Sequence, residues 1–124
     1  MTILIVDDHP IVLKGIHALM ASSFAEARIM DAAGLKEAEQ MLNRHKVDIL
    51  ITDLDLNGES GSMLIEHVRD VQPATQVVVY TMHEELWSVG EIADMDTEAV
   101  VMKSDNAAEL LMAVKSLCDG KGYY

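Results

Sequence analysis

The sequence is poor in cysteine and in positive charge. Cys118 is the one cysteine, so an internal disulfide is excluded, which fits a reducing, cytoplasmic setting. Nine Lys and Arg stand against 21 Asp and Glu, a formal net charge of −12. A protein that grips DNA needs clustered cations to neutralise phosphates, and the sequence has no such cluster. We therefore expect no DNA binding by this chain itself, and partners that are cations or carry basic patches.

Long apolar runs are also absent. The longest comprise four or five residues, far fewer than the roughly 20 needed to cross a bilayer, so no membrane span is predicted. The N-terminus has neither a basic region nor a small-residue cleavage site before Asp7-Asp8, which argues against a signal peptide. Half of the 124 residues are hydrophobic, so we expect one folded domain, 1–124, with a sizeable core.

Short apolar runs alternate with helical patterns along the chain. The runs are mostly continuous rather than alternating, which is typical of parallel strands covered on both faces. Apolar residues at helical spacing follow each run, most weakly in 84–95. With right-handed crossovers, this predicts an α/β, flavodoxin-like, doubly wound (βα)5 domain with a five-stranded parallel sheet, order 2-1-3-4-5, and helices on both faces. The predicted strands are 3–6, 27–30, 47–51, 77–80 and 99–102.

Polar side chains follow four of the predicted strands. Asp7-Asp8 follows the first, Asp53 the third, Thr81 the fourth and Lys103 the fifth. In doubly wound sheets the functional crevice lies outside the carboxyl ends of the strands, where the strand order reverses. The first and third strands flank that point, so we expect the carboxylates to meet there.

Carboxylates gathered this closely repel one another, and a hard divalent cation relieves the repulsion. Mg²⁺ fits best, because it takes one or two carboxylates together with waters and a phosphate oxygen. Lys103 offers a charge and Thr81 a hydrogen bond to a phosphoryl group. One carboxylate can then attack phosphorus and form an acyl phosphate.

These residues give the chain a strong resemblance to a known family. From end to end it resembles the receiver domain of bacterial two-component response regulators. The stretches around Asp7-Asp8-His9-Pro10, Thr81-Met82-His83 and Lys103-Ser104-Asp105 are similar to the NarL/FixJ subfamily, whose members carry a helix-turn-helix DNA-binding domain after the receiver. The resemblance implies a signalling domain that catalyses only its own aspartyl phosphorylation and dephosphorylation.

The resemblance also assigns roles to individual residues. Asp53 is the phosphoacceptor for a histidine kinase, and together with Asp8 it ligates Mg²⁺. Asp7 acts largely through water, and the backbone carbonyl of Asp55 is a further ligand. Lys103 pairs with the phosphoryl group, and Thr81 turns toward it on activation.

The implied partners are the cognate kinase, a second copy in a homodimer, and DNA only through an output domain after Tyr124. A stand-alone receiver that ends here is the alternative to such a domain.

Some residues depart from the family pattern. Many family members have an aromatic residue at the position of Val100, and in them this residue moves together with the threonine. Asn57 and Ser104 each replace a common proline, and we expect a trans bond or a rearranged loop at Lys103-Ser104. These changes do not affect the acidic site itself, but they concern how its phosphorylation would be transmitted to the rest of the domain.

Other functions fit the sequence less well. A pseudo-receiver, used only for binding, would typically lack one of the five site residues. A haloacid-dehalogenase-like phosphotransferase shares the Asp53-Leu54-Asp55 pattern but needs a longer chain. An EF-hand would need Glu where Leu64 stands. The five histidines show no tight metal spacing, and most are expected on the surface. Four methionines on or beside helical stripes are expected in the core: Met20, Met41, Met63 and Met112.

Overall fold

The computed structural model describes residues 1–82, 97–103 and 107–119. Its main sheet has five parallel strands in the order β2-β1-β3-β6-β7, which is the predicted order 2-1-3-4-5 counted along this sheet. The helix predicted within 84–95 lies outside the described residues. The strands are β1 (Thr2–Val6), β2 (Arg28–Ala32), β3 (Ile49–Thr52), β6 (Gln76–Thr81) and β7 (Ala99–Met102).

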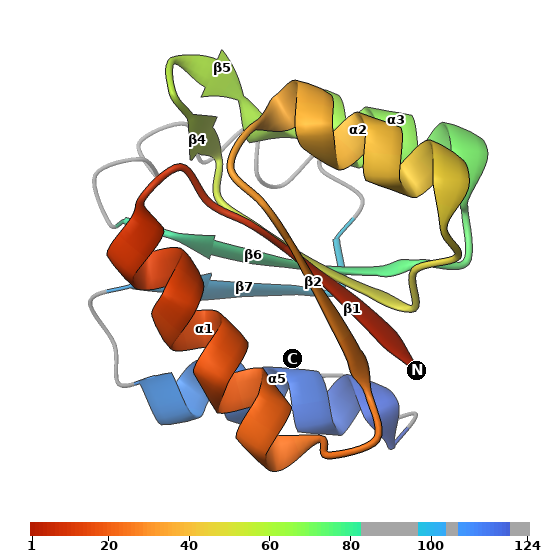
Figure 1. The fold of residues 1–124 in the computed structure, drawn as a ribbon. Coiled ribbons are helices and arrows are strands. Elements are labelled where there is room, and N and C mark those ends of the chain that lie inside the picture. The colour runs from red at the N-terminus through yellow and green to blue at the C-terminus, as the bar shows by residue number, and fades with distance from the viewer. Residues whose placement is uncertain (83–96, 104–106, 120–124) are drawn as a thin grey trace.

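Helices cover both faces of this sheet (Figure 1). One face carries α1 (Pro10–Ser23) and α5 (Ala107–Cys118), and the other carries α2 (Leu35–Arg44) and α3 (Gly61–Val71). Pro10 occupies the first turn of α1, where its missing N–H has no helical partner to lose. The predicted doubly wound architecture is confirmed. Among the described residues, none of the helices has the length and hydrophobicity needed for a membrane span.

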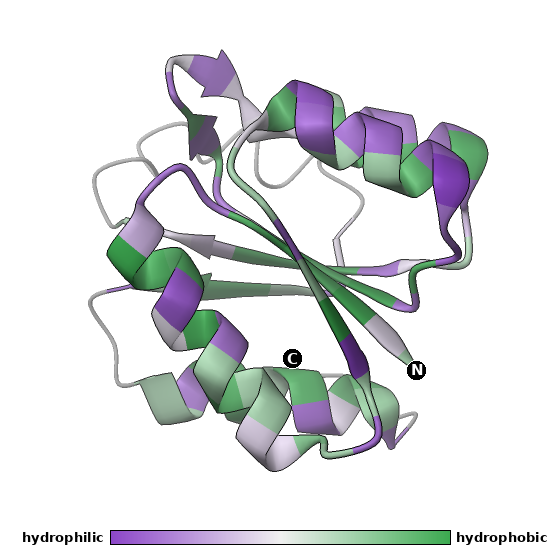
Figure 2. Cartoon of the chain, viewed as in Figure 1, coloured by the Kyte–Doolittle hydropathy of each residue, from purple (hydrophilic) through white to green (hydrophobic). Residues whose placement is uncertain are grey.

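The sheet separates two hydrophobic cores. In β1, Leu4 and Val6 pack with α2 and α3, whereas Ile3 and Ile5 pack with α1 and α5. Because helices cover both faces of the sheet, the residues that point to either face are mostly apolar. The strands therefore form a hydrophobic band through the middle of Figure 2. Met20 is fully buried as expected. The prediction was wrong for Met63 and Met112, which are 53% and 56% exposed because they face away from the cores.

The strand register determines which residues meet at the carboxyl edge. Val6 of β1 pairs with Thr52 of β3, so the next residues, Asp7 and Asp53, emerge side by side. Thr81 of β6 pairs with Met102 of β7, which places Lys103 one residue beyond the last pair. Side chains alternate between the faces of a strand, so a slip of one residue would turn each of them to the opposite face.

A short hairpin that the sequence patterns did not predict follows β3. It consists of β4 (Asp55–Leu56) and β5 (Glu59–Ser60), paired antiparallel. The two residues between them, Asn57 and Gly58, have φ angles of 59° and 87°. Positive φ at both central positions is the requirement of the tightest hairpin turns, and Asn-Gly is the dipeptide that best meets it. Figure 1 shows the hairpin beyond the carboxyl ends of the strands, where it leads into α3.

At the opposite edge of the sheet, Gln72 joins several backbone segments. Its Oε1 accepts a hydrogen bond from Val47 N–H at 2.8 Å. Its Nε2 donates to the carbonyl oxygens of Leu42 at 2.7 Å and His45 at 2.6 Å. Nearby, Thr75 Oγ1 donates to the carbonyl of Val47 at 2.6 Å. Hydrogen bonds between the side chains of Gln72 and Thr75 and backbone groups therefore fix the loops that enter β3 and β6.

An ion pair closes the same edge next to β7. Arg69 of α3 contacts both carboxylate oxygens of Glu98 through Nη2, each at 2.9 Å. Its Nη1 also donates to the carbonyl of Thr75 at 2.6 Å. A guanidinium that binds a carboxylate and a carbonyl at once holds α3 against the ends of two strands.

Candidate functional site

The structure brings the predicted site residues together at the carboxyl edge. Asp7, Asp53 and Thr81 are buried, at 2%, 1% and 0% exposure. The Lys103 side chain is 7% exposed and that of Asp8 is 18% exposed. Burying ionised groups is costly unless they are paired with each other or with an ion, so their partners define the chemistry of the site.

Lys103 bridges two of the carboxylates. Its Nζ lies 2.7 Å from Asp7 Oδ2 and 2.6 Å from Asp53 Oδ2. Burial lowers the pKa of Lys103, but the hydrogen bonds to Asp53 and Asp7 and the negative charges of both carboxylates together outweigh burial and raise the pKa above its ordinary value. The lysine is therefore a fixed positive charge beside Asp53.

The other oxygen of Asp53 accepts two weaker hydrogen bonds. Thr81 Oγ1 donates to Asp53 Oδ1 at 3.2 Å, and the backbone N–H of Asp55 donates to the same oxygen at 3.3 Å. Thr81 is the last residue of β6 and Asp55 is the first residue of β4, so the fold presents both donors to one carboxylate. These are the groups that a phosphoryl group on Asp53 would meet first.

Asp8 is held by the unexpected hairpin. Its Oδ2 accepts a hydrogen bond from the backbone N–H of Asn57 at 2.8 Å. Proline, the common family residue at this position, has no N–H to donate. Asp8 Oδ1 is buried and has no hydrogen-bond partner within the described part of the chain. An orphaned buried carboxylate oxygen that faces two other carboxylates is what a cation site requires.

His9 joins the site, although the sequence patterns placed most histidines on the surface. Its side chain is 60% exposed, yet its Nδ1 lies 2.9 Å from Asp7 Oδ1 and 3.1 Å from Asp8 Oδ1. The hydrogen bond to Asp7 and the charge of Asp8 raise the pKa of His9. Its position directly after two acidic residues was the signal that could have identified it.

The backbone of Asp53 is packed tightly against the start of α3. A Cβ added at Gly61 would lie 2.1 Å from the carbonyl oxygen of Asp53 and 2.9 Å from Cα of Leu54. The N–H of Gly61 donates to the carbonyl of Leu54 at 2.7 Å. Only glycine allows the helix to approach the loop this closely.

The donor set fits a hard divalent cation. Ligand atoms of Asp7, Asp8, His9 and Asp53 all lie within 4.8 Å of one another. Three carboxylates face one lysine, so the site carries excess negative charge even when Lys103 is counted. Asp55 follows Asp53 closely enough for its carbonyl to complete the set, and that role stays a prediction. The acidic pocket is therefore able to hold a metal ion.

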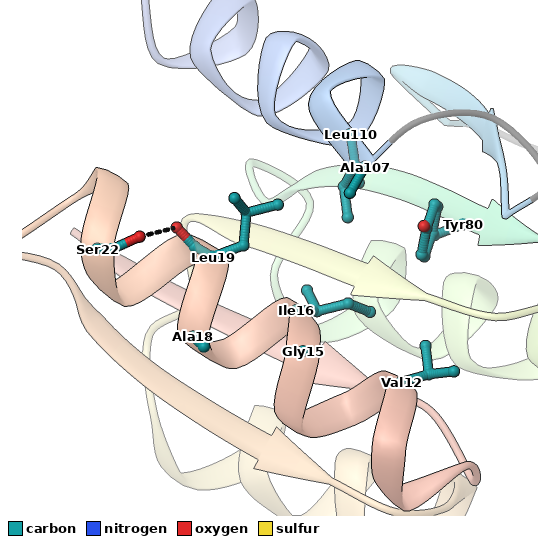
Figure 3. Close-up of a pocket in the computed structure, with 9 residues that line it drawn as sticks. All are labelled: Val12, Gly15, Ile16, Ala18, Leu19, Ser22, Tyr80, Ala107 and Leu110. Carbon is teal, nitrogen blue, oxygen red and sulfur yellow. Dashed lines mark hydrogen bonds between the residues drawn. The ribbon is translucent and has the colours of Figure 1, made fainter.

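A second concave region lies between α1 and α5. A cavity of about 550 Å³ is bounded by α1, by Tyr80 of β6 and by Leu110 of α5. Figure 3 shows that aliphatic side chains such as Ile16 and Leu19 point into it. It includes none of the acidic site residues, so its chemistry is apolar and separate from that of Asp53.

Comparisons with known proteins identify the family. The model of the response regulator receiver domain matches residues 3–115, so the chain belongs to the response regulator receiver family. The transcriptional regulatory protein RcsB of Escherichia coli (strain K12) is 32% identical over 130 residues, which cover 99% of this chain and 58% of RcsB. The chain therefore spans little more than half the length of such curated relatives.

Solved structures agree with this assignment. The isolated receiver domain of RcsB from Salmonella enterica serovar Typhimurium, studied with the phosphomimetic BeF3−, has a TM-score of 0.86 and 28% identity over 98% of this chain and 91% of that one. A structure of two RcsB dimers bound to two parallel DNAs has a TM-score of 0.84 and 28% identity, covering 98% and 62%. The flavodoxin-like fold and the resemblance to the NarL/FixJ subfamily are confirmed.

Proposed function

We propose that this receiver domain accepts a phosphoryl group on Asp53 from a histidine kinase, with Mg²⁺ at the acidic pocket. One observation carries the proposal: the buried Asp53 carboxylate has Lys103 Nζ at 2.6 Å on one oxygen and Thr81 Oγ1 at 3.2 Å on the other. A carboxylate flanked by a cation, a hydroxyl and two further carboxylates is arranged for phosphoryl chemistry rather than for stability alone.

In the transfer step, an Asp53 oxygen attacks phosphorus while the bond from phosphorus to the kinase histidine nitrogen breaks. The product is an acyl phosphate on Asp53, and the electron pair of the broken bond stays on the histidine. Lys103 compensates the negative charge of the phosphoryl oxygens. Asp8, Asp53 and the Asp55 carbonyl would hold Mg²⁺, with Asp7 acting through water. When bound, the ion would neutralise charge on the transferring group.

The response to phosphorylation would begin at Thr81. Its hydroxyl now bonds to Asp53 Oδ1, and a phosphoryl group there offers stronger, charged acceptors. Movement of Thr81 would be transmitted through β6, which is buried along most of its length. Val100 is a partly buried aliphatic residue of β7 that packs against the α2 and α3 core, so the switch would operate without an aromatic partner.

We further propose that the domain controls transcription through a DNA-binding output domain and a homodimer, as expected of a regulator that works in the cytoplasm. The similarity to RcsB, a transcriptional regulatory protein whose dimers have been solved on DNA, supports this. The net charge of −12 also argues that any DNA contact belongs to another domain. The chain would catalyse only its own phosphorylation and dephosphorylation.

The test is covalent labelling with a small phosphodonor in Mg²⁺, followed by mass spectrometry of the intact protein. The wild type should gain one phosphoryl group, and Asp53→Asn should gain none. Asp70→Asn, a change on the exposed side of α3, is the matched control and should label like the wild type. Labelling that persists in Asp53→Asn would remove Asp53 from this role. A wild type that never labels, yet still folds, would indicate the pseudo-receiver alternative.

A further inference from the structure

The His9 imidazole lies among the carboxylates in a way that one hydrogen bond does not explain. Its Nδ1 approaches oxygens of two different residues almost equally, Asp7 Oδ1 at 2.9 Å and Asp8 Oδ1 at 3.1 Å. One ring N–H makes its hydrogen bond to Asp7, so the contact with Asp8 is at most the weaker part of a shared, three-centre arrangement. Asp8 Oδ1 has no hydrogen bond from any described residue, although it is buried. The nitrogen therefore stands 3.1 Å from a buried carboxylate oxygen that has no hydrogen bond among the described residues.

These spacings match those between neighbouring ligands of a metal ion. Ligands about 2.1 Å from an octahedral ion lie about 3.0 Å apart along each edge of the octahedron. The contact of His9 Nδ1 with Asp8 Oδ1, at 3.1 Å, falls at this edge length, and Asp8 is one of the residues that would ligate the ion directly. Asp53 also contributes an atom that lies within 4.8 Å of the ligand atoms of Asp7, Asp8 and His9. Two ligands of the same ion lie within this distance of each other whether they are neighbours or lie on opposite sides of the ion.

The remaining contacts orient the same atoms. Lys103 binds Asp7 and Asp53 through their Oδ2 atoms. The hairpin amide of Asn57 binds Asp8 through its Oδ2 at 2.8 Å. In Asp7 and Asp8 the Oδ1 atom is left toward His9. The backbone N–H of His9 also donates to Asp7 Oδ1 at 2.9 Å, which fixes the loop that carries the imidazole. The geometry is already in place before any ion binds.

From this arrangement we propose that His9 Nδ1 is a ligand of the metal site and shifts its preference from Mg²⁺ toward divalent transition ions such as Mn²⁺. The inference rests on the proposed function, because it concerns the same ion site. Mg²⁺ favours oxygen ligands and binds nitrogen poorly, whereas imidazole strengthens the binding of first-row transition ions. An all-oxygen site would discriminate less between the two ions.

The test uses Mn²⁺ as the probe and electron paramagnetic resonance as the readout. The signal of free Mn²⁺ gives its dissociation constant, and its recovery on addition of Mg²⁺ gives that of Mg²⁺. Pulsed measurements detect coupling between bound Mn²⁺ and a coordinating imidazole nitrogen. His9→Asn removes the imidazole but keeps a residue that is favoured at the N-cap position, which His9 occupies in α1. His67→Asn, on α3, removes an imidazole far from the strand ends and is the matched control.

We expect nitrogen coupling in the wild type and in His67→Asn, and none in His9→Asn. The preference for Mn²⁺ over Mg²⁺ should fall about tenfold in His9→Asn. If the wild type binds both ions, shows no nitrogen coupling and keeps its preference in His9→Asn, the role of His9 is overturned while the proposed function stands. If the wild type binds neither ion, both are overturned. Circular dichroism of each variant establishes that it is folded.

Discussion

The two ends of the parallel strands carry polar networks of opposite design. At the amino ends, the Gln72 amide accepts a hydrogen bond through its oxygen and donates two through its nitrogen, and Arg69 pairs with both oxygens of Glu98. At the carboxyl ends, Lys103 pairs with Asp7 and Asp53, but the neighbouring Asp8 keeps a buried oxygen without a hydrogen bond among the described residues. The described residues supply hydrogen-bond partners for the side chains at the amino ends, whereas the network at the carboxyl ends leaves one carboxylate oxygen for a ligand.

This difference separates groups that stabilise the fold from groups that prepare it for a ligand. A satisfied buried amide contributes to stability, and its loss leaves backbone groups without partners. Like charges held together oppose folding until a cation or a phosphoryl group changes the balance. The same strands therefore support a stabilising edge and a reactive edge. Removing a hydrogen-bonding group at the amino edge should lower the free energy of unfolding, whereas removing one of the clustered charges at the carboxyl edge should raise it when no divalent ion is present.

The largest effect is expected where the reactive edge depends on close packing. In Gly61→Ala the added methyl group would overlap the Asp53 carbonyl, with Cβ 2.1 Å away. We expect a loss of about 3 kcal/mol in the free energy of unfolding and slower labelling of Asp53, measured by urea denaturation and mass spectrometry. Gly15→Ala is the matched control. It has no atom within 4 Å of the new Cβ and should stabilise α1 by up to about 1 kcal/mol.

A somewhat smaller loss is expected at the amino edge. Gln72→Ala removes the hydrogen bonds of the amide group with Val47, Leu42 and His45, and a longer one that Thr75 Oγ1 donates at 3.4 Å. The free energy of unfolding should fall by about 2 kcal/mol, while the labelling of Asp53 and the binding of divalent ions stay unchanged. Gln40→Ala, on the exposed side of α2, should remain within about 0.5 kcal/mol of the wild type. A Gln72→Ala protein that also loses ion binding would show that the two edges are coupled.

The smallest effect has the opposite sign. Asp8→Asn removes one of three clustered charges, and its amide oxygen can still accept the hydrogen bond from Asn57. Without divalent ions, we expect the free energy of unfolding to rise by about 1 kcal/mol. Adding Mg²⁺ should stabilise the wild type and have little effect on the variant. Urea denaturation with and without the ion measures both, with Asp70→Asn as the control. A variant less stable than the wild type in the absence of ions would mean that the Asp8 carboxylate stabilises the fold more than its repulsion opposes it.

The sequence predicts the sheet and its acidic edge well because both follow from local patterns. Runs of β-branched residues mark the strands, and polar residues directly after them must meet where parallel strands end. Asp7, Asp53, Thr81 and Lys103 come together as expected. The resemblance to receiver domains adds the roles of these residues, which spacing alone does not supply.

The remaining features depend on contacts between segments far apart in the chain. The bond from Asn57 to Asp8 joins residues 49 positions apart, and no local pattern indicates it. The Asn57-Gly58 dipeptide is a signal for the hairpin, but Asn57 also stands where the family often has proline, and the stretch from Asp53 to Gly58 partly matches an EF-hand loop. His9 lies at the surface as expected, with 60% of its side chain exposed, but only the fold brings its ring to two carboxylates. Met63 and Met112 are exposed because a helical stripe is wider than the core it covers.

The pairing of Val6 with Thr52 gives the strands β1 and β3 little tolerance for changes in length. Inserting or deleting one residue in either strand would turn its side chains toward the opposite faces of the sheet and would also carry an aspartate away from the acidic site. Both losses would arise from one event. Length changes that accumulate in homologous genes should therefore be confined to the connections between the elements, and the segment between β3 and α3, where this protein forms its hairpin, is one such connection.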